Sequence, residues 1–100
     1  MTPEAERYRE QLRAMLPKLA ERFGVSELGL FGSRVRGDHR PDSDLDVLVT
    51  FRPDARPSLF TLSDLVLTLE ERLGVSVELA LKENLKPRLR PHILREEVRV

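Results

Sequence analysis

The spacing of apolar residues constrains the fold most, because segments with helical spacing alternate with short apolar segments that are typical of strands. From Pro3, apolar residues recur every three or four positions until Gly24, which suits the end of a helix. Pro17 lies inside this segment, so we expect a kink there or two abutting helices. A second amphipathic helix is predicted over residues 58–73.

Three short segments are predicted to form strands, and they span residues 27–31, 45–51 and 75–81. The segment 45–51, rich in Val and Leu, is the clearest of them. The polar segment 34–43 is expected to form a turn or short helix followed by a loop. Residues 52–57 should form a loop, and the C-terminal part has helical character around 91–98. The predicted order is helix–strand–(turn or short helix)–strand–helix–strand–helix. It indicates an α/β fold in a single domain spanning residues 1–100.

Composition argues against several classes of protein. Basic and acidic residues number 17 each, so the formal net charge is zero and we expect no direct binding to nucleic acid. No apolar run approaches the roughly 20 residues of a membrane helix, and no signal peptide is visible, so no membrane association is expected. The chain has no Cys, which excludes disulfides and thiolate metal sites. We expect a cytoplasmic protein.

Asp44 and Asp46 lie at the start of the predicted strand 45–51. Side chains two residues apart on a strand share one face, so the two carboxylates would stand side by side and repel each other. A divalent cation removes this conflict, and Mg²⁺ prefers hard oxygen ligands. The alternative is that Asp44 lies in a solvated turn while Asp46 pairs with a nearby arginine, which is the commoner outcome for so short a motif.

Gly32 and Ser33 directly follow the predicted strand 27–31. Glycine allows a sharp turn and a close approach of a ligand, and the backbone N–H groups and serine hydroxyl beyond it can bind phosphate. An ordinary strand-ending turn is the alternative. The chain lacks the glycine-rich motifs of P-loop and dinucleotide-binding folds.

Glu78 lies between Val77 and Leu79 in the third predicted strand, so its side chain should point away from the face that these two residues share. If this strand lies beside 45–51, Glu78 can stand next to the Asp pair. The three carboxylates would then be candidates for a site with two metal ions about 3.5–4 Å apart, as in many nucleotidyl transfers. The alternative is a surface glutamate on an edge strand.

These motifs together resemble a known family. Residues 30–37 (LFGSRVRG) and 41–49 (PDSDLDVLV) are similar to the nucleotidyltransferase signature, in which Gly-Ser is followed by ten residues and then Asp-x-Asp. The chain looks most like the minimal nucleotidyltransferases (MNT) of prokaryotes, the antitoxin partners in HEPN/MNT toxin–antitoxin pairs. The resemblance covers nearly the whole chain.

The resemblance implies a DNA polymerase β-like palm fold, with a small mixed β-sheet and helices packed on it. It implies that Gly32 and Ser33 contact the triphosphate of ATP and that Asp44 and Asp46 bind Mg²⁺. Glu78 falls where the family usually has a third Asp, which helps to bind metal and to activate the attacking hydroxyl. The implied activity is transfer of AMP from ATP to a HEPN-type toxin. The alternative is a weak or inactive module that neutralises the toxin by forming a complex, and Glu78 in place of Asp favours it.

Two further features bear on substrates and partners. Arg36 and Arg34 follow the Gly-Ser pair, and either could meet a phosphate, with Arg36 as the predicted nucleotide-binding residue. The chain of 100 residues has no room for an acceptor-binding domain. Either a protein acceptor, such as a HEPN-type toxin, completes the site, or the domain works in a homo- or hetero-oligomer.

Overall fold

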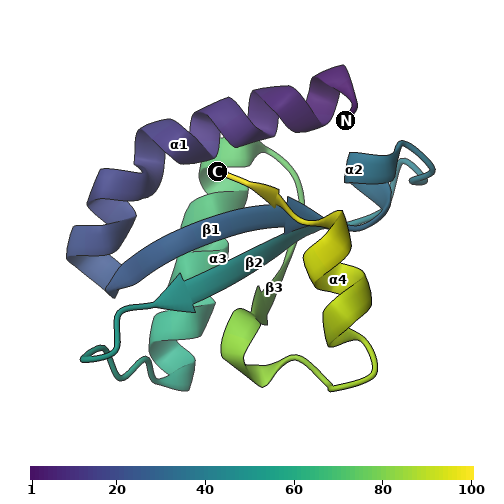
Figure 1. The fold of residues 1–100 in the computed structure, drawn as a ribbon. Coiled ribbons are helices and arrows are strands. Elements are labelled where there is room, and N and C mark those ends of the chain that lie inside the picture. The colour runs from purple at the N-terminus through teal and green to yellow at the C-terminus, as the bar shows by residue number, and fades with distance from the viewer.

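The computed structural model describes residues 1–100, and its core is a four-stranded sheet in the order β3-β2-β1-β4. β1 (Val25–Phe31) pairs antiparallel with β2 (Leu45–Phe51), and β2 pairs parallel with β3 (Val77–Leu81). β4 (Val98–Arg99) pairs antiparallel with β1. The sheet is therefore mixed, and the predicted α/β class is confirmed (Figure 1).

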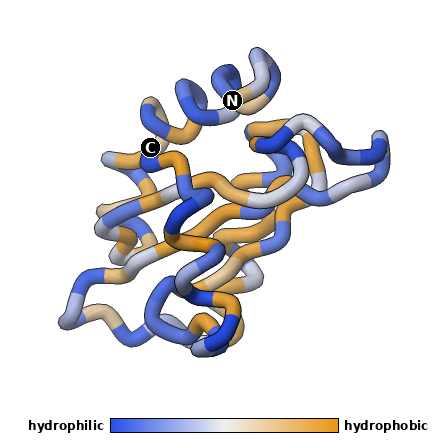
Figure 2. Tube along the Cα trace, turned by 45° about the vertical axis from the view of Figure 1, so that its right-hand side comes forward, coloured by the Kyte–Doolittle hydropathy of each residue, from blue (hydrophilic) through white to orange (hydrophobic).

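Two long helices cover one face of this sheet (Figure 1). α1 (Pro3–Phe23) packs on β1, α3 (Leu59–Leu73) packs on β3, and the two helices also contact each other. Alternate residues of β2 face these helices and are buried, namely Leu45, Val47, Val49 and Phe51. Figure 2 shows this arrangement as hydrophobic strands at the centre and hydrophilic loops at the periphery. The opposite face of β2 carries Asp46, Leu48 and Thr50.

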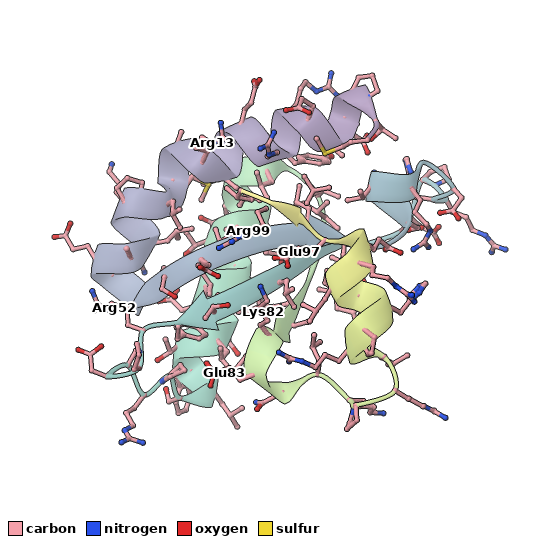
Figure 3. The ribbon with its side chains drawn as sticks, in the orientation of Figure 1. Arg13, Arg52, Lys82, Glu83, Glu97 and Arg99 are labelled. Carbon is pink, nitrogen blue, oxygen red and sulfur yellow. The ribbon has the colours of Figure 1, made fainter.

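The C-terminal segment comprises the 3-10 helix η1 (Lys82–Asn84), α4 (Arg90–Glu96) and β4. β4 is the edge strand beside β1, while α4 lies in front of the sheet near the end of β1 (Figure 1). Figure 3 shows Lys82 and Glu97 pointing toward one another in front of the sheet, and their side chains form an ion pair of 3.2 Å. The carboxylate of Glu97 lies so close to Gly29 that a Cβ at that glycine would contact it. This segment therefore covers part of the face that α1 and α3 leave open.

Several predicted boundaries need correction. β1 begins at Val25, two residues earlier than expected, because Gly24 ends α1 with a left-handed turn and accepts a hydrogen bond from the Arg52 N–H. β3 begins at Val77, not at residue 75. Helix α1 is continuous through Pro17, so it is not two helices, although Figure 1 shows it bending toward β1 in its last turns. No helix has both the length and the apolar character needed to cross a membrane.

The largest correction concerns residues 91–98, which were predicted as helical. α4 ends at Glu96, and Glu97 leaves the helix with φ −57° and ψ 131°. The next residues form β4, in which Val98 pairs with Leu30 and Arg99 with Gly29. A strand of two residues has no periodicity of its own, so local sequence could not reveal it. The pairing attaches the C-terminal end of the chain to β1, close to the predicted Gly-Ser turn.

Candidate active site

Asp46 and Glu78 stand side by side at the centre of the predicted site. They are register partners in the parallel pair of β2 and β3, so both side chains point to the sheet face opposite the main core. The placement of Glu78 next to Asp46 was conditional on these two strands being neighbours, and the structure confirms that condition. Two carboxylates in adjacent register positions repel each other unless a proton or a cation lies between them.

The electrostatics of Asp46 reflect this crowding. Partial burial, together with the neighbouring Glu78 carboxyl group, raises the pKa of Asp46 to about 7 from an ordinary value of 3.8. The charge of Asp44 raises the pKa further, while the positive charge of Arg36 opposes the rise. Asp46 therefore holds a proton far more readily than an ordinary aspartate. Such a site favours a cation.

Gly32 brings the end of β1 into direct contact with Asp46. Its φ of 85° and ψ of −164° lie where side chains are rarely tolerated, and a Cβ at this position would collide with Asp46 Oδ2. The Gly32 carbonyl oxygen accepts the N–H groups of Val35 and Arg36, which begins the short helix α2 (Ser33–Arg36). The turn thus places Ser33 directly after the residue that touches Asp46.

Asp44 lies just before β2 and is exposed. Its charge acts on Asp46, so the two carboxylates share one region of the surface. The structure contains no group of three His, Asp or Glu side chains already arranged to hold a metal ion. What it presents is the adjacent pair Asp46 and Glu78, with Asp44 next to them. The metal-binding and catalytic roles of these three residues stay predictions.

The two arginines after the Gly-Ser turn, Arg34 and Arg36, differ in burial and in hydrogen-bond partners. Arg34 is 6% exposed, and its guanidinium group donates to the carbonyl oxygens of Ser43 and Pro41 and to Glu4 Oε1, the last at 2.7 Å. It fastens the loop that leads into Asp44 onto the start of α1. It is therefore a structural residue, although its sequence position suggested a phosphate contact or a solvated charge. Local sequence gives no sign of this role, since Glu4 is 30 residues away.

Arg36 is exposed and lies on the site side of α2. It forms ion pairs with Asp38 at 3.2 Å and with Glu96 Oε1 at 2.8 Å. These two carboxylates raise its pKa. Its contact with a nucleotide stays a prediction, and the pairing with Glu96 is a feature that the sequence did not suggest. The two residues are 60 positions apart.

The largest groove lies elsewhere. It measures about 610 Å³ and runs between α1 and α3, with Met15, Arg22 and Arg72 among its lining residues. None of the predicted site residues lines it. A second groove, of about 580 Å³, is lined mainly by apolar residues of α3 and β3 and includes Glu78. Of the candidate site residues, only Glu78 lines the second groove, and none lines the largest one.

Comparison with known proteins agrees with this geometry. The nucleotidyltransferase domain family matches residues 12–100. The protein adenylyltransferase MntA of Thermococcus cleftensis is 46% identical over 89 residues, which cover 89% of this chain and 88% of that protein. A solved structure with the provisional name minimal nucleotidyltransferase is 41% identical, with a TM-score of 0.74, and the match covers 93% of this chain and 92% of that one.

Complexes of toxins and antitoxins share the fold. In a Shewanella oneidensis complex of a tri-AMPylated HEPN toxin with its MNT antitoxin, a chain matches with a TM-score of 0.65 at 15% identity, over 92% of this chain and 70% of that one. At this identity the likeness establishes the fold alone. Together with the closely similar sequences, it leads to one conclusion: the chain belongs to the nucleotidyltransferase domain family, among the minimal nucleotidyltransferases.

Proposed function

We propose that this protein is a Mg²⁺-dependent adenylyltransferase that moves AMP from ATP to a hydroxyl group of a HEPN-type toxin and so acts as its antitoxin. The observation that carries the proposal is the contact between Gly32 and Asp46, with Glu78 adjacent to Asp46. A phosphate-binding turn and a carboxylate cluster are the two parts that nucleotidyl transfer needs in one place. The name of the relative from Thermococcus cleftensis, a protein adenylyltransferase, supports ATP and a protein acceptor.

The donor set fits a hard divalent cation. Asp46 and Glu78 present carboxylate oxygens in adjacent register positions, and Asp44 adds a third nearby. Mg²⁺ is usually held by only one or two protein carboxylates, and phosphate oxygens and water complete its coordination. Bound there, Mg²⁺ would neutralise charge on the triphosphate and lower the barrier for displacement at the α-phosphorus.

The chain's own residues then have distinct proposed roles. Gly32, Ser33 and Arg36 hold the triphosphate, while Asp44 and Asp46 are the principal metal ligands. The acceptor oxygen forms a bond to the α-phosphorus, the bond between that phosphorus and the oxygen bridging to the β-phosphate breaks, and pyrophosphate leaves. Glu78 accepts the proton of the acceptor hydroxyl, because it lies at the exposed edge of the carboxylate pair.

A protein acceptor is favoured by the surface beside Glu78. Leu59 and Phe60, at the start of α3, are 81% and 88% exposed. Leu59 also lines the apolar groove that includes Glu78. Exposed apolar clusters of this kind are typical of protein contacts. A partner bound here would bring its hydroxyl group to Glu78.

The test is transfer of label from ATP to a HEPN-type partner in the presence of Mg²⁺. The wild-type protein should label the partner, and the double variant Asp44→Asn, Asp46→Asn should not. Asp42→Asn is the matched control, since it removes an exposed carboxylate two residues from Asp44 and should leave labelling intact. A tight complex that carries no label with the wild-type protein would refute catalysis and support neutralisation by binding alone.

A further inference from the structure

Glu96 joins the C-terminal helix to both parts of the predicted triphosphate site. It is the last residue of α4, and its side chain is 14% exposed. One atom, Oε1, accepts hydrogen bonds from the Gly32 backbone N–H and from Arg36 Nη1. A single carboxylate oxygen therefore links the turn to the arginine, although Glu96 lies 64 residues from Gly32 in the sequence.

This link holds the Gly-Ser turn from two sides. Asp46 occupies the space that a side chain at position 32 would need, and the Gly32 N–H donates to Glu96. Rotation of the turn would break one of these contacts. Because β4 pairs with β1 directly after α4, Glu96 itself is held at a defined height along the sheet.

The same link orients Arg36. Its Nε donates to Asp38 and its Nη1 to Glu96, so two separate carboxylates hold the guanidinium plane. The third nitrogen, Nη2, has no acceptor in the protein. An arginine side chain loses considerable rotamer freedom when it binds a ligand. Because Asp38 and Glu96 already hold the Arg36 side chain, part of this entropy cost is avoided on binding. Arg36 is thus held ready, with one nitrogen left for a phosphate oxygen.

We propose that Glu96 is a positioning residue that acts through Arg36 and the Gly32 turn to hold the triphosphate of the nucleotide. This inference rests on the proposed nucleotidyltransferase function. A carboxylate beside a triphosphate also repels it, so removal of Glu96 has two opposite effects on binding. Orientation of Arg36 and Gly32 outweighs repulsion here, because the 2.8 Å charge-assisted hydrogen bond with Arg36 offsets much of the negative charge of Glu96.

The test measures the Kd of Mg²⁺–ATP by titration calorimetry for the wild-type protein, Glu96→Gln, Arg36→Met and the double variant. Glutamine keeps an acceptor for the Gly32 N–H but loses the charge that holds Arg36. We expect Glu96→Gln to weaken binding about tenfold, and to have little further effect once Arg36 is Met, because the two residues act together. In the transfer reaction, KM for ATP should rise by a similar factor while kcat changes little.

Glu97→Gln is the matched control. It removes the adjacent glutamate, which pairs with Lys82 and touches neither Gly32 nor Arg36, so it should leave the Kd within about twofold. Equal or tighter binding by Glu96→Gln, or a tenfold loss that persists in the Arg36→Met background, overturns the inference. If Glu96→Gln does not fold, Arg36→Lys takes its place in the test. Lysine keeps the positive charge but lacks the planar guanidinium group that Glu96 and Asp38 hold. Unchanged affinity in this variant overturns the inference.

The wild-type result separates this inference from the proposed function. If the wild-type protein binds no Mg²⁺–ATP, the proposed function fails and the inference fails with it. If the wild-type protein binds and Glu96→Gln binds equally well, only the role of Glu96 is refuted.

Discussion

Asp46 of β2 and Glu78 of β3 are register partners, so their two carboxylates lie side by side. The turn at Gly32 contacts the carboxylate of Asp46. In a chain without a function such a pair would be a defect, because like charges in adjacent register positions destabilise a sheet. Their position beside a turn suited to phosphate makes the site a candidate for metal-assisted chemistry.

Substitution of Gly32 by Ala should abolish nucleotide transfer. The new Cβ would collide with Asp46 Oδ2, and the φ of 85° disfavours any side chain. We expect the free energy of unfolding to fall by about 1–3 kcal/mol and transfer to fall by about a hundredfold or more. Gly74→Ala is the matched control, because Gly74 has a similar φ of 69° but nothing within 4 Å of the added Cβ. It should lose less stability, because only backbone strain applies there, and it should keep its activity; equal loss of activity in both variants would refute the role of the contact between Gly32 and Asp46.

The stability of the metal-free protein should depend on pH through Asp46. Its folded-state pKa is raised to about 7, above the ordinary 3.8, so between these values the folded state binds the proton more tightly than the unfolded state does. Stability from this group is therefore greatest at low pH, falls as pH rises toward 7 and levels off above it. Urea unfolding with a chelator at pH 5 and pH 8 measures the difference. Asp46→Asn should reduce it, and Mg²⁺ should restore stability at pH 8; a pH dependence unchanged by Asp46→Asn would contradict the assignment.

Removal of the Arg34 side chain should destabilise the fold. Arg34→Met leaves two loop carbonyl oxygens and Glu4 without their donor, so we expect a loss of about 2–4 kcal/mol in the free energy of unfolding. Arg13→Met is the control, since this α1 residue has no ion pair or side-chain hydrogen bond, and it should change stability by less than about 0.5 kcal/mol. A loss below about 1 kcal/mol for Arg34→Met, measured by denaturant unfolding, would show that the loop before Asp44 is held by other contacts.

Glu78 should matter for the chemical step more than for nucleotide binding. Glu78→Gln removes the proposed proton acceptor while keeping the shape of the side chain, so kcat should fall about a hundredfold or more. Glu78→Asp keeps a carboxylate at this position and should retain measurable activity. Steady-state kinetics at saturating ATP distinguish the two variants. Full activity in Glu78→Gln would exclude Glu78 as the base.

Much of this site follows from local sequence patterns. The strand 45–51 was predicted with its observed bounds, because an unbroken Val- and Leu-rich segment between turns has few other structures open to it. Side-chain alternation also predicted that Glu78 points away from Val77 and Leu79, and parallel pairing with β2 then placed it beside Asp46. These inferences needed only the period of a strand and one assumption about which strands are neighbours.

What escaped prediction depends on contacts between distant residues. The two-residue strand β4 exists only because β1 offers an edge, and Glu96 reaches Gly32 only because β4 holds α4 in place. Arg34 and Arg36 have the same charge and lie two residues apart, yet one is buried as a structural clamp and the other is exposed near the site. No local pattern separates them, because their different positions depend on ion pairs with Glu4 and Glu96, which lie at opposite ends of the chain.

The most direct test of the central claim compares ATP labelled at the α-phosphate with ATP labelled at the γ-phosphate, each mixed with Mg²⁺, the protein and its HEPN-type partner. Nucleotidyl transfer at the Asp46–Glu78 pair requires the α-label to become covalently attached to the partner while pyrophosphate is released and the γ-label stays in solution. Attachment of the γ-label, or of neither label, would contradict it.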